Sequence, residues 1–324
     1  MAHRRTRAID RAYPRKSTPR RYTPTNAFAL ARTALRVGRK LNVPVVGTNH
    51  FLPENVTPYL HLPAPLEAIV KNWCWRYFLR TYEELDVVTV PSHTALVRIR
   101  KAGFSGEGIV ISNGIDLKQF SPVCEDDLFA RHLLPKGPKM LYVGRLDREK
   151  NVAFAIRAFA KVAENINGYF VIAGSGSEEN KLRYLARELG VEGRIVFTGF
   201  VPACNLPALY RAVDVFVMPG TAELQSIATM EAMATGLPII AADAMALPEL
   251  VRDGVNGLLF QPFDQTSLVH CMEATLSNAA LRGRLGQASL REIQKHDINY
   301  SVSSLETLYG TFSSNSIREV AASA

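Results

Sequence analysis

The chain has 324 residues, a length that suits two domains better than one core. Hydrophobic residues make up 47% and charged residues 21%, as in globular proteins, and no segment has the roughly 18 uninterrupted apolar residues of a membrane span. The net charge of +8 arises from residues 1–40, which hold twelve Lys or Arg against one acid, whereas positions 41–324 carry −3. We expect a cytoplasmic protein, since the first residues also lack an apolar leader.

Residues 1–26 are rich in arginine and proline and contain almost nothing apolar, which predicts a disordered basic arm. Such an arm could instead bind nucleic acid or anionic lipid, although we expect no nucleic-acid partner. The four cysteines form no C-x-x-C pair, so neither a zinc site nor a redox site is expected; they are Cys74, Cys124, Cys204 and Cys271.

The region 27–120 alternates helical segments with short apolar strands and is predicted to be one domain. Helices are expected over 29–42, 65–85 and 93–103, and strands over 43–50, 85–92 and 108–115. Alternation of this kind indicates a parallel sheet covered by helices on both faces. The segment 121–137 has no periodicity and several prolines, and is predicted to be the linker.

The region 138–298 repeats the alternation more completely, with a last helix over 299–324 that is expected to cross back to the first domain. Strands are predicted over 138–144, 168–174, 193–199, 214–219, 237–242 and 257–262. Helices are predicted to begin near Asn151, Glu178, Leu206 and Ser226. The fold class is therefore α/β with two Rossmann-like, doubly wound domains, and ligands are expected at the carboxyl ends of the strands.

Two cations flank a strand-to-helix turn in the second domain. Arg145 directly follows a strand and Lys150 precedes a helix, whose free N–H groups would add to a site for a diphosphate. The alternative is a solvated turn, where Lys and Arg are common. A glycine turn around Gly174 and Gly176 fits either close approach of a nucleotide or ordinary turn formation.

Two glutamates interrupt the apolar stretch GTAELQSIATMEAMATGLPII of residues 220–240. Glu223 is predicted to lie in the loop after a strand, and Glu231 in the second turn of the following helix. Carboxylates accept hydrogen bonds from vicinal diols, so the pair could hold the two ends of one polyhydroxylated ligand. Alternatively, Glu223 caps the helix and Glu231 is an exposed helix residue.

Taken in order, five motifs resemble the retaining nucleotide-sugar glycosyltransferases with the GT-B fold (glycosyl transferases group 1). They are GTNH (47–50), SNGID (112–116), VGRLDREKN (143–151), AGSGSE (173–178) and ELQSIATMEAMATGLP (223–238). The resemblance implies that Glu223 contacts the transferred sugar and that Glu231 binds the donor ribose. It implies a diphosphate site at Arg145 and Lys150, and no metal or other cofactor.

The same resemblance makes His50, at the mouth of the first domain, and Glu223 the catalytic candidates; a plain loop histidine is the alternative for His50. It places the main-chain amides of Leu224, Gln225 and Ser226 beside the sugar, and Gly174 and Val201 near the nucleotide. The implied chemistry is front-face attack by the acceptor hydroxyl, assisted by the leaving diphosphate, so Glu223 is not expected to be a nucleophile.

The acceptor is expected to be a lipid, because NHFLPENVTPYLHLP and the ELQS loop resemble the branch that transfers glucose from UDP-glucose to diacylglycerol. A soluble sugar or a phosphatidylinositol-type lipid is the alternative. The helix over 65–85 supports either a peripheral membrane face or ordinary core. Its aromatic and basic residues are Trp73, Trp75, Tyr77, Phe78, Tyr82, Lys71, Arg76 and Arg80.

The family's first strand and glycine-rich loop have no match in residues 1–26, so we expect a truncated N-terminal domain. Either the gene product is incomplete, or the missing part comes from a partner that associates through the exposed sheet edge. A chain shortened in this way could also bind a nucleotide sugar without transferring it.

Overall fold

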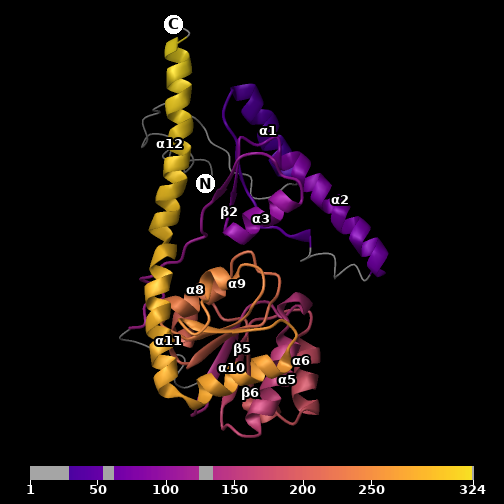
Figure 1. Cartoon of the computed structure of the whole chain (residues 1–324), viewed down its shortest axis with the longest axis vertical. Helices are drawn as coiled ribbons and strands as arrows, with labels where there is room; N and C mark the ends of the chain where they lie inside the picture. Colours follow the sequence, from indigo (N-terminus) through magenta and orange to yellow (C-terminus); the bar gives the residue numbers. More distant parts are fainter. Residues whose placement is uncertain (1–28, 54–61, 124–133, 323–324) are drawn as a thin grey trace, which may run out of the picture.

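The computed structural model describes residues 29–53, 62–123 and 134–322, which form two α/β domains (Figure 1). The predicted basic arm (1–26) lies outside the described residues, as do residues 124–133 of the predicted linker. Each domain contains one parallel sheet, as the alternation of strands and helices predicted.

The N-terminal domain contains a three-stranded parallel sheet in the order β1-β2-β3. Its strands are β1 (Val46–Thr48), β2 (Val87–Val90) and β3 (Gly108–Val110). Its helices are α1 (Ala29–Leu41), α2 (Ala64–Tyr82) and α3 (His93–Lys101). All four residues of β2 are buried, because helices pack against this central strand.

The C-terminal domain contains a six-stranded parallel sheet in the order β6-β5-β4-β7-β8-β9. Its strands are β4 (Lys139–Val143), β5 (Tyr169–Ala173), β6 (Ile195–Gly199), β7 (Val215–Met218), β8 (Ile239–Ala242) and β9 (Gly257–Phe260). Strand order reverses between β4 and β7, and parallel sheets of this kind bind ligands outside the carboxyl ends of the strands at that point. The loops after β4 and β7 therefore define where the site should lie.

The first four helices of this domain connect its strands and begin close to the predicted positions, and two more follow β9. They are α5 (Val152–Ala163), α6 (Glu179–Glu188), α7 (Leu206–Arg211), α8 (Ile227–Ala234), α10 (Gln265–Ser277) and α11 (Ala279–Glu292). A further helix, α9 (Leu247–Leu250), was not predicted, since a single turn containing a proline has too few residues to show a period.

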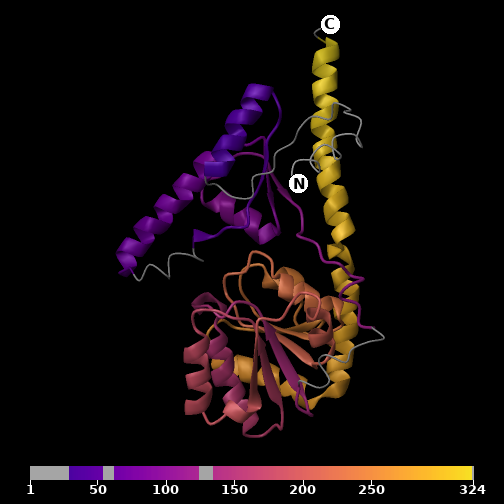
Figure 2. The same ribbon diagram turned by 180° about the vertical axis from the view of Figure 1, so that it is seen from behind.

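The last helix, α12 (Ile298–Ala322), returns to the N-terminal domain and runs alongside its sheet (Figures 1 and 2). Leu308 of this helix packs against Val46 and Val87, one from each of two neighbouring strands. The helix matches the predicted range of 299–324 closely, and it gives the small N-terminal sheet part of its apolar cover.

Several contacts hold the two domains together near the strand ends. The chain crosses between domains twice, and the two crossings pair at Ile115 and Asp297. The amides of His93 and Thr94, at the start of α3, donate to the carboxylate of Glu249 in α9 at 3.0 and 2.6 Å. A carboxylate at a helix N-terminus is favourable, so this contact attaches α3 to the other domain.

The long helix α2 is half core and half surface. Its last turns bury Phe78 and Tyr82 in the N-terminal core, while Leu66, Ile69 and Trp73 in its first turns are exposed. The last turns of the helix are therefore core, and the first turns are surface, where contact with a membrane stays a prediction. In Figure 2 the first turns of α2 project away from the rest of the domain.

Candidate active site

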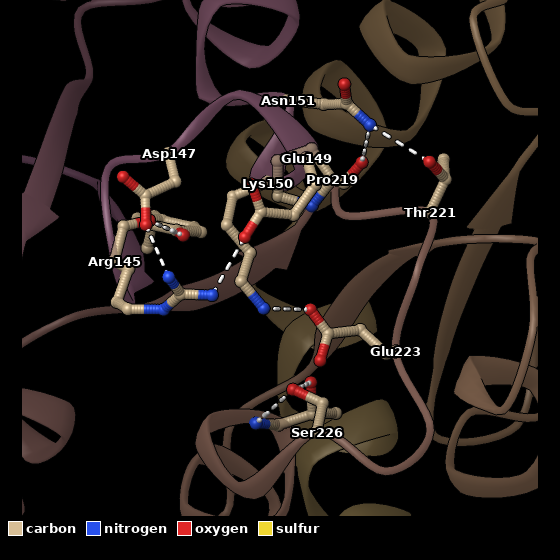
Figure 3. A network of polar contacts seen from close by, with 11 residues as sticks. Arg145, Asp147, Glu149, Lys150, Asn151, Pro219, Thr221, Glu223 and Ser226 are labelled. Atoms are coloured by element: carbon tan, nitrogen blue, oxygen red, sulfur yellow. Dashed lines mark hydrogen bonds and ion pairs between the residues drawn. The ribbon is translucent and has the colours of Figure 1, made fainter. Parts of the chain in front are cut away.

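The predicted diphosphate and sugar residues meet at the reversal of strand order in the C-terminal sheet. Arg145 and Lys150 follow β4, and Glu223 follows β7, its neighbour in the sheet. Two loops separated by more than 70 residues of sequence are thus brought face to face (Figure 3).

Lys150 and Glu223 form a direct ion pair, with 2.6 Å between Nζ and Oε1. Both side chains are mostly buried, at 19% and 11% exposure, so water screens their attraction only weakly. Asn151, the next residue, adopts a left-handed backbone and donates from Nδ2 to Pro219 O and to Thr221 Oγ1. Three contacts therefore tie the β4 loop to the β7 loop.

The guanidinium of Arg145 is held by two carboxylates. Nη1 lies 2.6 Å from Asp147 and Nη2 lies 2.8 Å from Glu149, so both arms of the fork are engaged (Figure 3). Behind it, the hydroxyl of Tyr142 donates to the carbonyl oxygen of Arg145 at 2.8 Å, and burial with the charge of Glu223 raises the pKa of that tyrosine. Arg145 is 64% exposed, and these two carboxylates hold it at the strand end.

The glycine turn after β5 packs against the loop after β4. At Gly174, with φ of 139°, a Cβ atom would lie 1.9 Å from the carbonyl oxygen of Gly144. At Gly176 it would lie 2.5 Å from the backbone of Leu146. Both glycines are therefore required for two loops to approach each other, which supports the turn interpretation of this motif.

A cavity of about 230 Å³ opens at the carboxyl ends of β4, β5 and β6. Arg145 lines it together with the two predicted nucleotide contacts, Gly174 and Val201. The other lining residues are Val143, Gly144, Ala173, Ser175, Phe200 and Leu206. Phe200 is 77% exposed, so an aromatic face is available at the rim of a largely apolar cavity.

Ser226 is the N-cap of α8, where its hydroxyl accepts from the amide of Thr229. The capping alternative for Glu223 is therefore excluded. The rest of the loop is held by the N-terminal domain. Ser92 Oγ donates to Leu224 O at 2.6 Å. The side chain of Gln225 donates from Nε2 to Ser112 Oγ and accepts at Oε1 from the amide of Asn113. Since the Gln225 side chain is engaged there, only its main chain is available to a ligand.

Glu231 lies on the second turn of α8, as predicted, and is only partly exposed. Its Oε2 accepts a hydrogen bond of 2.7 Å from the hydroxyl of Tyr210, a fully buried residue of α7. Burial raises the pKa of the Glu231 carboxyl, and the Tyr210 hydrogen bond opposes that rise. The alternative of a solvated helix residue is excluded for Glu231.

His50 follows β1 in the N-terminal domain, so it comes from a different sheet than the other predicted residues. The residue is exposed, and desolvation by the protein around it lowers the pKa of the imidazole, which favours the neutral form. The preceding residue, Asn49, is buried, and its Oδ1 accepts from the amide of Phe51 and the hydroxyl of Tyr82. This turn fixes the backbone on both sides of His50.

Four residues that the sequence analysis did not select belong to this site: Asp147, Glu149, Phe200 and Tyr210. Asp147 and Glu149 lie within the DREK turn. The sequence shows these acids near Arg145 but does not show that both pair with it. Phe200 directly follows a strand, which was a usable signal. In the described part of the chain, no three His, Cys, Asp or Glu side chains gather as metal ligands.

Two protein-family models match the chain. Residues 125–291 match the model described as Glycosyl transferases group 1, and residues 23–119 match Glycosyltransferase Family 4. The chain belongs to the glycosyl transferases group 1 family. The resemblance drawn from the five motifs is thereby confirmed at the level of the family.

Relatives within the family differ in the substrates for which they are named. The chain is 28% identical to alpha-monoglucosyldiacylglycerol synthase of Streptococcus pneumoniae over 72% of its length and 54% of that protein. It is 28% identical to D-inositol 3-phosphate glycosyltransferase of Corynebacterium aurimucosum over 83% of its own length and 66% of that protein. The chain therefore spans about half to two thirds of the curated relatives it matches.

Among solved structures, HepE of Anabaena in complex with UDP-glucose is similar, with a TM-score of 0.76 and 21% identity. The match covers 90% of this chain and 78% of HepE. The prediction of a GT-B fold is confirmed, with an N-terminal domain whose sheet has half as many described strands as the C-terminal one.

Proposed function

We propose that this group 1 glycosyltransferase moves a hexosyl group from a UDP-sugar, UDP-glucose in the first instance, to the hydroxyl of a lipid such as diacylglycerol. The observation that carries the proposal is the Lys150–Glu223 pair beside the fixed Arg145. It sets two cations at one strand edge, next to a cavity, each paired with carboxylates of the protein. The phosphates of a sugar diphosphate can take the place of these carboxylates as partners of the two cations, and its sugar hydroxyls can donate to Glu223.

In this proposal the donor extends from the cavity to the sugar loop. The cavity beside Arg145, with Phe200 at its rim, takes the base, and Glu231 accepts from the ribose. Arg145 and Lys150 bind the diphosphate and stabilise the charge that develops as the glycosidic C–O bond breaks. Glu223 and the main-chain amides of the following residues contact the sugar.

Retention follows from attack on the face that the diphosphate leaves. The acceptor oxygen forms the new bond to the anomeric carbon, the bond to the diphosphate breaks, and the acceptor proton passes to a diphosphate oxygen. Neutral His50, on the opposite domain, hydrogen-bonds the sugar during this step. Support for UDP-glucose comes from HepE, a protein of the same fold whose structure holds that molecule.

Three observations support a lipid acceptor at a membrane surface. One face of α2 exposes Leu66, Ile69 and Trp73 at spacings of three and four residues. Residues 1–82 carry a net charge of +12, against −4 for residues 83–324, which favours anionic headgroups. One relative is named as a glucosyldiacylglycerol synthase. Within the described residues no helix is long and apolar enough to cross a bilayer.

The test uses the full chain with radiolabelled UDP-glucose and three acceptors presented separately: diacylglycerol in mixed vesicles, phosphatidylinositol in vesicles, and soluble glucose. We expect label in the diacylglycerol fraction and, by NMR, an α-linked product. Label only in phosphatidylinositol products or soluble saccharide would overturn the acceptor. A β-linked product would overturn retention.

A second candidate, binding without transfer, is favoured by one observation: the described N-terminal sheet has three strands against six in the other domain. It predicts UDP binding by calorimetry and no labelled product with any acceptor. The Glu231→Ala variant should weaken that binding in either case, because the ribose contact is lost while the diphosphate contacts remain, so this variant checks the donor site independently of turnover.

A further inference from the structure

The partner of Glu231 is a tyrosine with no other evident reason to carry a hydroxyl. Tyr210 is completely buried in α7, and its ring packs between Phe120 at 6.0 Å and Phe216 at 5.9 Å, measured between centroids. A phenylalanine would fill the same space without the cost of burying a polar group. The hydroxyl must therefore be explained by what it bonds.

That hydroxyl has two acceptors within reach, Oε2 of Glu231 at 2.7 Å and the carbonyl oxygen of Ala228 at 3.2 Å. It has only one hydrogen to give. The shorter contact, to a group that can carry charge, is the stronger of the two when Glu231 is ionised. This hydrogen bond engages Oε2, so we take Oε1 of the same carboxylate as the acceptor for a ligand.

We propose that Tyr210 is a positioning residue for nucleotide binding, which orients the Glu231 carboxylate so that Oε1 accepts from a ribose hydroxyl. The inference rests on the proposed function, because it requires Glu231 to face the ribose. Nothing in the sequence pattern pairs these two residues, which lie 21 positions apart on different helices.

The arrangement has a consequence for pH. Burial raises the pKa of Glu231 and the Tyr210 hydrogen bond lowers it, so removing the hydroxyl raises that pKa further. When Glu231 is protonated, the Tyr210 hydrogen can turn to Ala228 O and the carboxyl stops acting as an anionic acceptor. Burial and the charge of Glu231 raise the pKa of Tyr210, and Tyr142 of β4, a further titratable group that faces the pair, adds to the rise.

The probes are UDP and its 2′,3′-dideoxy analogue, titrated by calorimetry into the full chain across a range of pH. Their affinity ratio isolates the ribose contact, because titration of the diphosphate, of His50 and of the rest of the site affects both ligands alike. The variants are Tyr210→Phe and Glu231→Ala. Tyr82→Phe is the matched control: that tyrosine is also buried, and it donates to Asn49 Oδ1 in the other domain.

We expect Glu231→Ala to abolish the preference for UDP over the dideoxy analogue. Tyr210→Phe should lower it by about 3- to 10-fold near neutral pH, the size expected when one hydrogen bond to a charged group is lost indirectly. The preference should also disappear at a higher pH than in the wild type. Tyr82→Phe should keep the wild-type preference at every pH.

Each contrary result has a distinct meaning. If Glu231→Ala keeps the preference, Glu231 does not bind ribose and that part of the proposed function fails. If Glu231→Ala loses it but Tyr210→Phe behaves as the wild type, or weakens both ligands equally at every pH, the positioning role fails. Should Tyr210→Phe not fold, 3-fluorotyrosine at position 210, a stronger donor, must extend the preference to lower pH; no extension overturns the inference.

Discussion

The two domains differ in how firmly their functional loops are held. In the C-terminal domain the loops after β4, β5 and β7 are joined by ion pairs, hydrogen bonds and glycine contacts, all close to the sheet. In the N-terminal domain, His50 follows a strand of three residues, and the first turns of α2 leave apolar side chains exposed.

The difference indicates where rigidity matters for the proposed reaction. Binding a diphosphate requires charges that are already in position, because reorienting them at the moment of binding would cost free energy. A lipid acceptor with long acyl chains instead requires exposed apolar surface. The two sides are coupled, since Ser92 of the N-terminal domain holds the backbone of the sugar loop at Leu224 and Asn113 holds the side chain of Gln225.

Glu223→Gln should have the largest effect on activity, and it tests the firmly held loops of the C-terminal domain. The change removes the anionic partner of Lys150 and the carboxylate proposed to face the sugar. We expect kcat to fall about 100- to 1000-fold while the Kd for UDP changes less than about threefold. Steady-state transfer assays and calorimetry measure these quantities.

The control for that prediction is Glu188→Gln, which changes an exposed glutamate of α6 in the same domain and should leave both values unchanged. A kcat for Glu223→Gln within about threefold of the wild type would remove Glu223 from the proposed sugar contact.

Gly174→Ala tests whether the C-terminal loops really depend on close backbone approach. The added Cβ would lie 1.9 Å from Gly144 O, on a backbone that L-residues rarely adopt. We expect a loss of about 3 kcal/mol in the free energy of unfolding, measured by urea denaturation.

The comparison variant is Gly283→Ala in α11, where an added Cβ meets nothing within 4 Å. It should raise stability by about 0.5 to 1 kcal/mol, because alanine is the better helix residue. Equal effects of the two substitutions would show that the loop contact at Gly174 is not tight.

His296 tests the coupling between the domains by pH. Its Nδ1 lies 2.9 Å from Ser112 Oγ, its carbonyl accepts from the amide of Ile115, and burial lowers its pKa to about 4. Below the unfolded value of about 6.5 the unfolded chain binds a proton that the folded chain does not, so stability falls as the pH drops from about 6.5 to 4. The loss is on the order of 2 kcal/mol.

Replacing this residue should flatten that pH dependence. His296→Gln should show a smaller fall in unfolding free energy over the same range, whereas His270→Gln, at an exposed site in α10, should match the wild type. His50, with its lowered pKa, contributes a slope of the same sign that remains in the variant. An unchanged slope would show that His296 charges freely in the folded protein.

Much of the fold and part of the site could be predicted from sequence, because both depend on local patterns. Short apolar segments between amphipathic ones fixed the strand positions, and parallel strands place their ends at one edge, so Arg145, Lys150 and Glu223 were expected together. The order of the glutamates after the cations then indicated the family.

The remainder depends on approach between distant segments. The Lys150–Glu223 pair joins residues 73 positions apart, and the side-chain amide of Gln225 bonds residues of the N-terminal domain more than 100 positions away. Neither partner could be chosen from spacing, because several acids and bases were available to each. The role of the Tyr210 hydroxyl was hidden for the same reason, since a buried tyrosine resembles any other core aromatic in sequence.

The smallest stability effect is expected in the N-terminal domain, at Trp73. This residue is 64% exposed and stacks on Tyr77, so Trp73→Ala should change the unfolding free energy by less than about 1 kcal/mol. Trp75, two positions on, is partly buried against the N-terminal core, and Trp75→Ala should cost about 2 kcal/mol.

Membrane binding should reverse that ranking. In flotation assays with vesicles that contain phosphatidylglycerol, Trp73→Ala should bind several-fold more weakly than the wild type, and Trp75→Ala should bind as the wild type does. The reason is that an indole at the surface inserts among headgroups, whereas one in the core does not reach them. If both variants bind vesicles equally well, the exposed face of α2 does not contact lipid, and the acceptor must reach His50 by another route.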